Sequence, residues 1–402
     1  MIEAVWALAA VGLVSCSVFV ALAGLAAVRF HRRKAATIPA RSMPPVTLLK
    51  PLCGVEPNLR ENLESFFRQD YPRFELVFGT RNAADPALHE VRDLQKKYPH
   101  VRVKIVFSGE PRRPNAKVCS LQAMYAVASH DFIVISDSDV RVTSDYVHQV
   151  VSPLLDANVG LVTCLYRGVP TGGLWTRLEA LGMSVEMTSG VLVADLLEGM
   201  KFALGPTMAT RRDVLQKTGG LATLADYCAD DYVLGRQVHD AGFAVVLSTY
   251  VVDHVIINRA PRASFAHQVR WMKSTRFSRS MGHIGTGLTF AMPFGLLALA
   301  AGLLNGLYLG VLMFAYAVLN RMLLSVIAGW TVVGDRNALR YAWLYPVRDA
   351  MGFVFWAASF FGRTIAWRAD RYRLEPGGKM VRLNALDANA PASKTIAVDD
   401  LA

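Results

Sequence analysis

The chain is poor in cysteine, with five in 402 residues, and these are too scattered for a CxxC pair or for the ligand spacing of a zinc site. A disulfide framework is therefore not expected, which suits a reducing compartment. The sequence also lacks a basic stripe with interleaved aromatic residues, although its formal net charge is +11. Nucleic-acid binding is not expected, because the basic residues gather beside apolar segments, where they orient a chain in a bilayer.

Charged residues are absent from residues 4–28, which is enough chain for one membrane-spanning helix. A cleaved signal peptide is disfavoured, because the run is too long for an h-region and positive charge follows it instead of preceding it. The basic cluster that follows consists of Arg29, Arg32, Arg33 and Lys34. We expect residues 1–34 to form a transmembrane helix with a basic flank, its N-terminus outside and the chain entering the cytosol at Arg29.

Charged residues are absent again from residues 284–320, a stretch too long for one span. We expect a transmembrane hairpin over residues 284–333 that turns near Asn305 and Gly306. The sequence is 53% hydrophobic, and its apolar residues concentrate at these two ends of the chain. This distribution predicts a globular domain held between membrane segments.

A further apolar segment, residues 341–367, has basic flanks on both sides and contains Arg348 and Asp349. The two flanks favour a re-entrant or interfacial segment over a simple crossing. Charges inside a membrane are costly, so we expect Arg348 and Asp349 to pair with each other, either near an acceptor entrance or as a purely structural ion pair. The tail, residues 384–402, is rich in Ala, Asp and Pro and is predicted to be disordered.

Between the membrane segments, residues 43–283 read as strands alternating with helices. The expected strands are residues 46–49, 76–79, 101–107, 132–135 and 161–165, and the expected helices are residues 58–69, 87–98, 117–128 and 146–155. This alternation predicts an α/β domain with a mainly parallel, Rossmann-like sheet. Ligands bind such sheets at the carboxyl ends of the strands, so the residues that follow each strand are the candidates for a site.

Asp137 and Asp139 come directly after the expected strand at 132–135, separated by one residue. Two carboxylates at one strand end can reach the same hard divalent cation, such as Mg²⁺ or Mn²⁺. Such a cation bridges the phosphates of a sugar nucleotide and offsets the charge on a leaving diphosphate. The alternative is a turn or helix cap rich in aspartate.

Two further motifs lie downstream. Asp230 and Asp231 stand in an acidic pair, where one carboxylate can take a proton from an acceptor hydroxyl; a helix N-terminus that favours acidic residues is the alternative. Residues 267–271 read His-Gln-Val-Arg-Trp. Arg270 and Trp271 can bind a diphosphate and stack on a ring, although a basic and aromatic membrane belt also fits this place in the chain.

Taken together, Asp85, Asp137 with Asp139, Asp231, and Arg270 with Trp271 form the series D, DxD, D, (Q/R)xxRW. This series resembles that of the inverting glycosyltransferases of the GT-A fold. The amino-acid sequence of residues 46–277 is similar to that of the ceramide glucosyltransferase family. The matching stretches are residues 49–59, 62–67, 70–72, 85–87, 115–118 and 137–142. Residues 163–170 and 346–362 are also similar to the bacterial hopanoid-pathway glycosyltransferase.

The resemblance implies a role for each matching residue. Asp85 would contact the uracil or ribose, Asp137 and Asp139 the metal and diphosphate, and Asp231 would be the general base. Arg270 and Trp271 would close over the diphosphate and acceptor, and Lys50 and Lys117 are further candidates for phosphate contacts. Two positions depart from the family pattern: His267 stands first in (Q/R)xxRW, and Asn82 stands where relatives often have a carboxylate. The pattern also leaves open whether Asp230 or Asp231 is the base.

The resemblance therefore implies transfer of a hexose from a UDP-sugar, UDP-glucose in particular, to a membrane lipid, with ceramide favoured over a hopanoid or diacylglycerol. The expected setting is a bacterial inner membrane with the catalytic domain in the cytosol. A hopanoid-type N-acetylglucosaminyltransferase stays open as an alternative. A processive polysaccharide synthase is disfavoured because the apolar segments are too few for a product channel. An inactive lipid-binding scaffold is disfavoured by the complete set of carboxylates.

Overall fold

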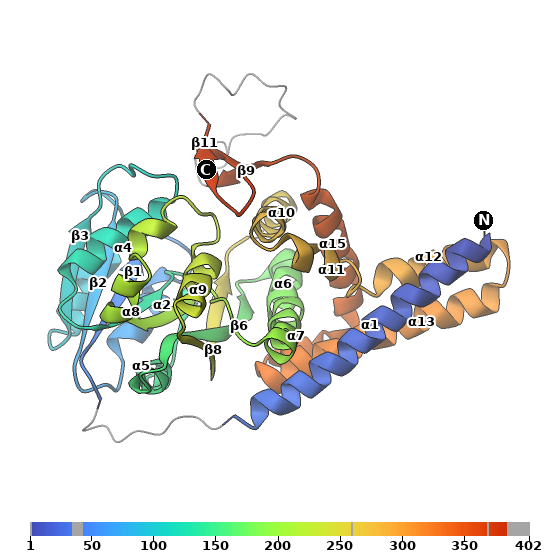
Figure 1. Ribbon diagram of the computed structural model, residues 1–402, viewed down its shortest axis with the longest axis horizontal. Helices are drawn as coiled ribbons and strands as arrows, with labels where there is room; N and C mark the ends of the chain where they lie inside the picture. The colour runs from blue at the N-terminus through green and yellow to red at the C-terminus, as the bar shows by residue number, and fades with distance from the viewer. Residues whose placement is uncertain (1, 34–42, 259, 368–369, 384–402) are drawn as a thin grey trace.

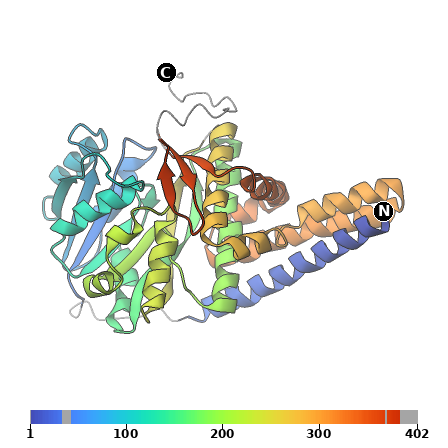
Figure 2. The same cartoon turned by 45° about the horizontal axis from the view of Figure 1, so that its top comes forward.

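The computed structural model describes residues 2–33, 43–258, 260–367 and 370–383. The predicted disorder of residues 384–402 falls outside this range. A domain built on a sheet occupies one end of the molecule, and a bundle of long helices extends from it (Figures 1 and 2). The apolar segments before and after the sheet domain in the sequence therefore lie side by side, on one side of that domain.

Three helices form the extended bundle: α1 (Ile2–His31), α12 (Met292–Leu304) and α13 (Leu307–Leu324). The predicted hairpin turn is right, because α12 ends before Asn305 and α13 begins after Gly306, whose φ is +93°. The two arms of the hairpin approach closely where both carry glycine. A Cβ added at Gly302 would lie 2.9 Å from the Cα of Gly310. Small residues of this kind let helix backbones pack at short range.

Among the described residues, three helices are long and apolar enough to cross a membrane: Ile2–His31, Leu307–Val332 and Gly173–Glu198. In the first two, only 39% and 33% of the most apolar window is buried. The third is 72% buried inside the protein, so it is an internal helix rather than a lipid-facing one. It comprises α6 (Gly173–Leu181), the π-helix η3 (Gly182–Met187) and α7 (Thr188–Glu198), and the sequence analysis did not predict it.

The main sheet has eight strands in the order β3-β2-β1-β4-β7-β6-β8-β5. Strands β1 to β4 run parallel to one another, and β6 runs parallel to β8, whereas β7 is antiparallel to β4 and β6 and β5 is antiparallel to β8. The bounds are β1 Val46–Pro51, β2 Phe74–Thr80, β3 Arg102–Phe107, β4 Phe132–Ser136, β5 Val140–Arg141, β6 Val159–Pro170, β7 Thr207–Arg211 and β8 Ala244–Ile256. The mainly parallel sheet is confirmed, and the antiparallel β7 beside β4 is an addition to it.

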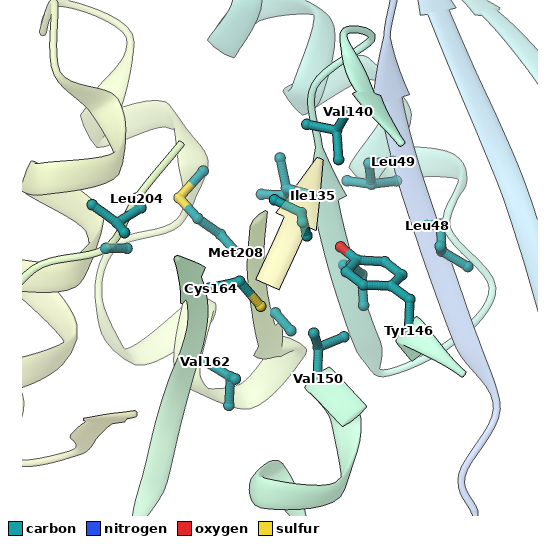
Figure 3. Close-up of a cluster of buried hydrophobic side chains, with 14 of the residues drawn as sticks. Leu48, Leu49, Ile135, Val140, Tyr146, Val150, Val162, Cys164, Leu204 and Met208 are labelled. Carbon is teal, nitrogen blue, oxygen red and sulfur yellow. The ribbon is translucent and has the colours of Figure 1, made fainter. Parts of the chain in front are cut away.

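Helices cover the sheet as the alternation predicts. They are α2 (Leu59–Phe67), α3 (Ala87–Lys97), α4 (Ala116–Val127), α5 (Tyr146–Val151) with the 3₁₀ turn η2 (Ser152–Leu155), α8 (Arg212–Lys217) and α9 (Asp230–Asp240). Apolar side chains from the strands and from α5 form the core, with Leu48, Ile135 and Val150 among those in Figure 3. The hydroxyl of Tyr146 in this core lies 3.1 Å from the hydroxyl of Thr207. The buried polar atom of the tyrosine therefore has a partner.

The remaining elements complete the sheet domain and connect it with the bundle. They are the 3₁₀ turn η4 (Leu221–Leu224), α10 (Pro261–Ser278), α11 (Ser280–Thr286), the π-helix η5 (Ser325–Val332), α14 (Arg336–Arg340), the 3₁₀ turn η6 (Ala342–Leu344), α15 (Tyr345–Ser359), and the strands β9 (Thr364–Trp367), β10 (Asp370–Leu374) and β11 (Met380–Arg382). The last three form an antiparallel sheet that the sequence analysis did not predict. It attaches to the main domain, because Met380 N donates to Asp226 O at 2.7 Å and Cys228 N donates to Gly378 O at 3.0 Å.

The expected pairing of Arg348 with Asp349 is wrong, because adjacent residues of a helix do not face each other. Asp349 accepts from Arg321 Nη1 at 3.1 Å through one oxygen. Its other oxygen accepts the backbone N–H of Ala291 at 3.0 Å and of Met292 at 2.9 Å, at the start of α12. Asp349 therefore caps a helix of the hairpin and neutralises a buried arginine of the other arm.

Arg348 points to different partners. Its Nη2 donates to Gln268 Oε1 at 3.0 Å, and its Nη1 lies 3.1 Å from Glu186 Oε2. Glycine makes room for the guanidinium, since a Cβ at Gly182 would lie 2.3 Å from Arg348 Nε and a Cβ at Gly352 would lie 2.9 Å from Nη1. Arg348 thus links α15 to α10 and to the internal helix.

We expect Arg321→Met to lower the free energy of unfolding by about 3–5 kcal/mol, because it leaves Asp349 buried without a counter-charge. Thermal unfolding of the detergent-purified chain measures the change. Arg336→Met, at an exposed position on α14, is the matched control and should unfold like the unaltered chain. Equal unfolding temperatures for the two variants would contradict this assignment.

Candidate active site

The structure brings together carboxylates from two distant parts of the chain. Asp137 follows β4, and Asp231 lies in the first turn of α9. Gly205, two residues before β7, lies against both. A Cβ added there would be 3.2 Å from Asp231 Oδ2 and 3.8 Å from Asp137 Oδ2. Asp137, the first carboxylate of the predicted DxD, and the downstream Asp231 therefore face one small volume at the carboxyl end of β4.

Lys117, at the start of α4, joins the two acidic segments. Its Nζ lies 2.6 Å from Asp137 Oδ1 and 3.8 Å from Asp230 Oδ2. Burial alone would lower the pKa of this ammonium, but Asp137 and Asp230 outweigh burial and raise it. Asn115 fixes the position, because its Oδ1 accepts from Val118 N at 3.1 Å and its Nδ2 lies 3.3 Å from Asp230 Oδ1. Lys117 is therefore a permanent positive charge among carboxylates.

Lys50, at the end of β1, is fully buried beneath the same strand end. Its Nζ donates to the backbone oxygen of Asp137, lies 3.4 Å from Ser136 Oγ, and sits 3.6 Å from the centre of the Phe66 ring. Burial lowers the pKa of Lys50 to about 7 against the opposing effect of Asp137. The structure thus gives Lys50 a supporting place under the DxD turn, and its direct contact with a phosphate stays a prediction.

Asp139 is the second carboxylate of the DxD. Its Oδ2 lies 3.4 Å from His254 Nε2, and its Oδ1 is buried without a hydrogen-bond partner. Glu56 lies close by and accepts from Ser138 Oγ at 2.8 Å. Burial, and then Asp139, raise the pKa of Glu56 to about 7. This cluster of oxygens carries more negative charge than its neighbours balance.

The cluster fits a hard divalent cation, because its donors are carboxylate oxygens and one of them, Asp139 Oδ1, has no partner. In the part of the chain that the structure describes, no three His, Cys, Asp or Glu side chains form a closed metal site. Two carboxylates without a full protein cage are typical of Mg²⁺ sites that a substrate phosphate completes.

The structure distinguishes Asp230 from Asp231 by their surroundings. Asp230 is 5% exposed and lies against Asn115 and Lys117. Asp231 accepts from Gly205 N at 2.7 Å and from Tyr232 N at 2.8 Å, and it faces the volume shared with Asp137. Burial, and then Asp230, raise the pKa of Asp231 to about 6. A carboxylate with that pKa is ionised at neutral pH and is a better proton acceptor than an ordinary aspartate.

The predicted Arg-Trp pair lies on α10, with Trp271 close to the carboxylates. The Trp271 ring is 4.5 Å from the ring of His267 and 6.5 Å from that of His254, which contacts Asp139. Arg270 lies over the Trp367 ring of β9 at 5.3 Å. Among the described residues no carboxylate pairs with Arg270, so its guanidinium is free to bind an anionic group.

Glu179, on the internal helix α6, was missed by the sequence analysis. Its buried carboxylate accepts from Ser264 Oγ at 2.6 Å, from His267 Nδ1 at 2.8 Å and from Asn258 Nδ2 at 3.0 Å. These donors come from the start of α10 and from the segment before it. Glu179 thereby holds the first position of the (Q/R)xxRW motif and, through the His267 ring, the face of Trp271. A glutamate within an apolar stretch offers no local sequence pattern that would reveal this role.

Asp85 lies at the start of α3 and organises the loop after β1. Its oxygens accept from Gly54 N at 3.0 and 3.1 Å and from Ala87 N at 2.9 Å. Gly54 has a φ of +70°, a conformation that glycine adopts easily. Nearby, Asn82 Oδ1 accepts from Ala84 N at 3.0 Å in a turn. The contact of Asp85 with uracil or ribose stays a prediction.

The chain is similar to known proteins along most of its length. The model of glycosyl transferase family 21 matches residues 5–380. The chain belongs to this family. It is 25% identical over 350 residues to ceramide glucosyltransferase 1 of Caenorhabditis elegans, across 85% of this chain and 74% of that one. It is 29% identical over 210 residues to ceramide glucosyltransferase 3 of the same organism, across 52% of this chain and 46% of that one.

Among solved structures, a mannosyltransferase from Pyrobaculum calidifontis in complex with GDP-Man and Mn²⁺ superposes with a TM-score of 0.58 and 18% identity. The match covers 90% of this chain and 99% of that one. A likeness at this identity shows the fold, and the predicted GT-A class is confirmed.

We expect Glu179→Gln to lower kcat/KM for sugar transfer by about tenfold to a hundredfold, since a hydrogen bond to a charged group contributes roughly 1.5–3 kcal/mol. The loss should be larger in kcat than in donor KM if Glu179 only positions the Trp271 face. Steady-state kinetics measure both, with Glu61→Gln at an exposed position of α2 as the control. Unchanged kinetics for Glu179→Gln would show that Glu179 does not position the motif.

Proposed function

We propose that the chain transfers a hexose from a UDP-sugar, with UDP-glucose preferred, to the hydroxyl of a ceramide-type membrane lipid, with inversion at the anomeric carbon. The observation that carries the proposal is the meeting of Asp137 and Asp231 beside Gly205 in a member of glycosyl transferase family 21. The names of the two Caenorhabditis elegans relatives support glucose as the sugar and ceramide as the acceptor.

In the proposed reaction, Asp231 takes the proton of the acceptor hydroxyl as its oxygen attacks the anomeric carbon. The bond between that carbon and the diphosphate oxygen breaks, and UDP leaves with the bonding electron pair. One displacement inverts the anomeric centre without a covalent enzyme intermediate. The backbone N–H groups of Gly205 and Tyr232 hold both oxygens of Asp231 in place during proton transfer.

The same cluster supports a role for a divalent cation, as in the Pyrobaculum calidifontis structure with Mn²⁺. Asp137 and Asp139 would hold Mg²⁺ or Mn²⁺, and the cation would offset the charge that builds on the leaving diphosphate. Lys117 and Arg270 add positive charge for the diphosphate, Trp271 packs against the acceptor, and Asp85 orders the loop proposed to hold the uracil or ribose.

We further propose that α1 and the helix of α13 with η5 cross a bacterial inner membrane, with the sheet domain in the cytosol. Support comes from their apolar surfaces and from Arg29 and Arg33 at the domain end of α1. The acceptor then presents its hydroxyl from the bilayer, and the sugar nucleotide arrives from the aqueous side.

A transfer assay on the purified chain tests the proposal. UDP-glucose or UDP-N-acetylglucosamine would be supplied with ceramide, diacylglycerol or a hopanoid alcohol as separate acceptors, in the presence of Mg²⁺ or Mn²⁺. We expect glucose to move to ceramide, EDTA to abolish transfer, and added metal to restore it. Asp231→Asn should lower kcat by roughly two to four orders of magnitude, whereas Asp213→Asn on α8 should not. Transfer to another lipid would correct the acceptor, and no transfer to any lipid would refute the function.

The pH profile of kcat/KM tests the assignment of the base. With Asp231 at a pKa of about 6 in the free chain, kcat/KM should fall about tenfold per pH unit below that pH, because the protonated base cannot accept a proton. Since Asp230 helps to raise the pKa of Asp231, Asp230→Asn should move this acidic limb to lower pH. A limb that stays in place would assign it to another group, such as Glu56, whose pKa is raised to about 7.

A further inference from the structure

A second pocket of about 430 Å³ lies behind the catalytic base, between the end of α7, the loop of residues 199–205, α9 and the junction of α10 with α11. Its charged lining residues are Lys201, Arg236, Arg279 and Glu198. Three cations therefore face one carboxylate, and Glu198 is already paired with Arg279. Arg236 pairs with Asp240 at 3.2 Å on the exposed side of α9. Within the described residues Lys201 has no ion pair, so the pocket has a surplus of positive charge.

The rim of this pocket is apolar. Met281 of α11 lines it and is 81% exposed, and Ile284 and Leu288 farther along are 54% and 52% exposed. Ile284 lies three residues after Met281 on α11, on the same side of that helix, and Leu288 follows in the turn after it. Leu197, next to Glu198, is exposed as well. An apolar strip thus runs from the basic pocket toward the start of α12.

The pocket also lies where the helix bundle meets the sheet domain. Arg29, in the last turn of α1, donates to the backbone oxygen of Leu196, and Arg33 pairs with Asp195, so α1 ends beside the end of α7. The segment after α11 leads directly into α12. Figure 1 shows α7 and α11 on the bundle side of the sheet domain, with α9 beside the sheet. If α1 and α12 lie in a bilayer, the pocket is at the height of the lipid head groups.

We propose that this pocket binds the phosphate of an anionic phospholipid, whose acyl chains lie along Met281, Ile284 and Leu288. Lysine and arginine are the side chains that bind phosphate, and the surplus of positive charge matches a head group with a net negative charge. This lipid is distinct from the acceptor, because none of Asp137, Gly205 and Asp231 lines the pocket. The proposal rests on the membrane placement proposed above.

The site is coupled to the base through the 199–205 loop and α9. The Phe202 ring stacks on that of Tyr232 at 6.3 Å in the pocket wall, while Gly205 N and Tyr232 N bind the carboxylate of Asp231. The loop packs directly on α9, since a Cβ at Gly235 would lie 2.3 Å from Ala203 N. A head group held by Lys201 therefore touches the segment that orients the base.

The test is the binding of a short-chain lipid to the full chain in a non-ionic detergent. Dihexanoyl phosphatidylglycerol would be titrated by calorimetry, with dihexanoyl phosphatidylcholine, glycerol 3-phosphate and inorganic phosphate as comparisons. We expect saturable binding of phosphatidylglycerol, at least tenfold weaker binding of the other three, and a loss of about tenfold or more in Lys201→Ala and in Arg236→Ala. Arg92→Ala, at an exposed position of α3, is the matched control and should bind normally.

Equal binding of the two lipids, or full binding by both pocket variants, would overturn the proposal. Inorganic phosphate that binds as tightly as phosphatidylglycerol would also overturn it, because the pocket would then be a site for free phosphate. Thermal unfolding of each variant, measured without lipid, checks that the substitution leaves the fold intact. If the chain transfers sugar but does not bind phosphatidylglycerol selectively, only this lipid site is refuted. If it binds phosphatidylglycerol selectively but transfers no sugar, the lipid site holds and the proposed function is refuted.

Discussion

The active site depends on the neutralisation of carboxylates that would otherwise repel one another. Asp137, Asp139, Asp230 and Asp231 meet at the carboxyl end of β4, where the buried Lys50 and the half-buried Lys117 hold them. Lys117 bridges the acidic segments from the side, and Lys50 supports the DxD turn from below. The compensation is incomplete, since Asp139 Oδ1 has no partner and Asp231 has a raised pKa. Because its negative charge is not fully balanced, the site favours the binding of a cation, and the raised pKa of Asp231 makes that carboxylate a better proton acceptor.

A second set of buried charges ties this site to the helix bundle. Arg348 contacts Glu186 of the internal helix and Gln268 of α10, two residues before Arg270. Glu179 of the same internal helix holds the start of α10 through three hydrogen bonds. The helix that carries the Arg-Trp pair is therefore held by polar contacts on two sides. These contacts fix the distance between the bundle and the carboxylates, which suits the proposed transfer of a sugar to a lipid presented from a bilayer.

The sequence was informative where the pattern was local. The strand that ends at Ser136 and the aspartates after it could be predicted because a short apolar run and the residues that follow it are contiguous in the chain. Strand β7 could not, since its partners β4 and β6 are set by tertiary packing. The apolar helix of residues 173–198 was missed, because its burial inside the protein depends on tertiary contacts that are not visible in the local sequence. The pairing of Arg348 with Asp349 was wrong because proximity along a helix was taken for proximity in space.

His267 shows how a departure from a family pattern is absorbed by its surroundings. Ser264 and Asn258 donate to Glu179, and donors of this kind favour its ionised form. An ionised carboxylate only accepts, so the 2.8 Å contact is a hydrogen bond in the tautomer of His267 that carries its proton on Nδ1. That bond fixes the plane of the imidazole, and the ring then packs against Trp271 at 4.5 Å. A glutamine or arginine here could also donate to Glu179, but neither carries an aromatic ring for the tryptophan. His267 therefore both binds Glu179 and packs against Trp271, and Glu179 fixes the ring orientation that allows the second contact.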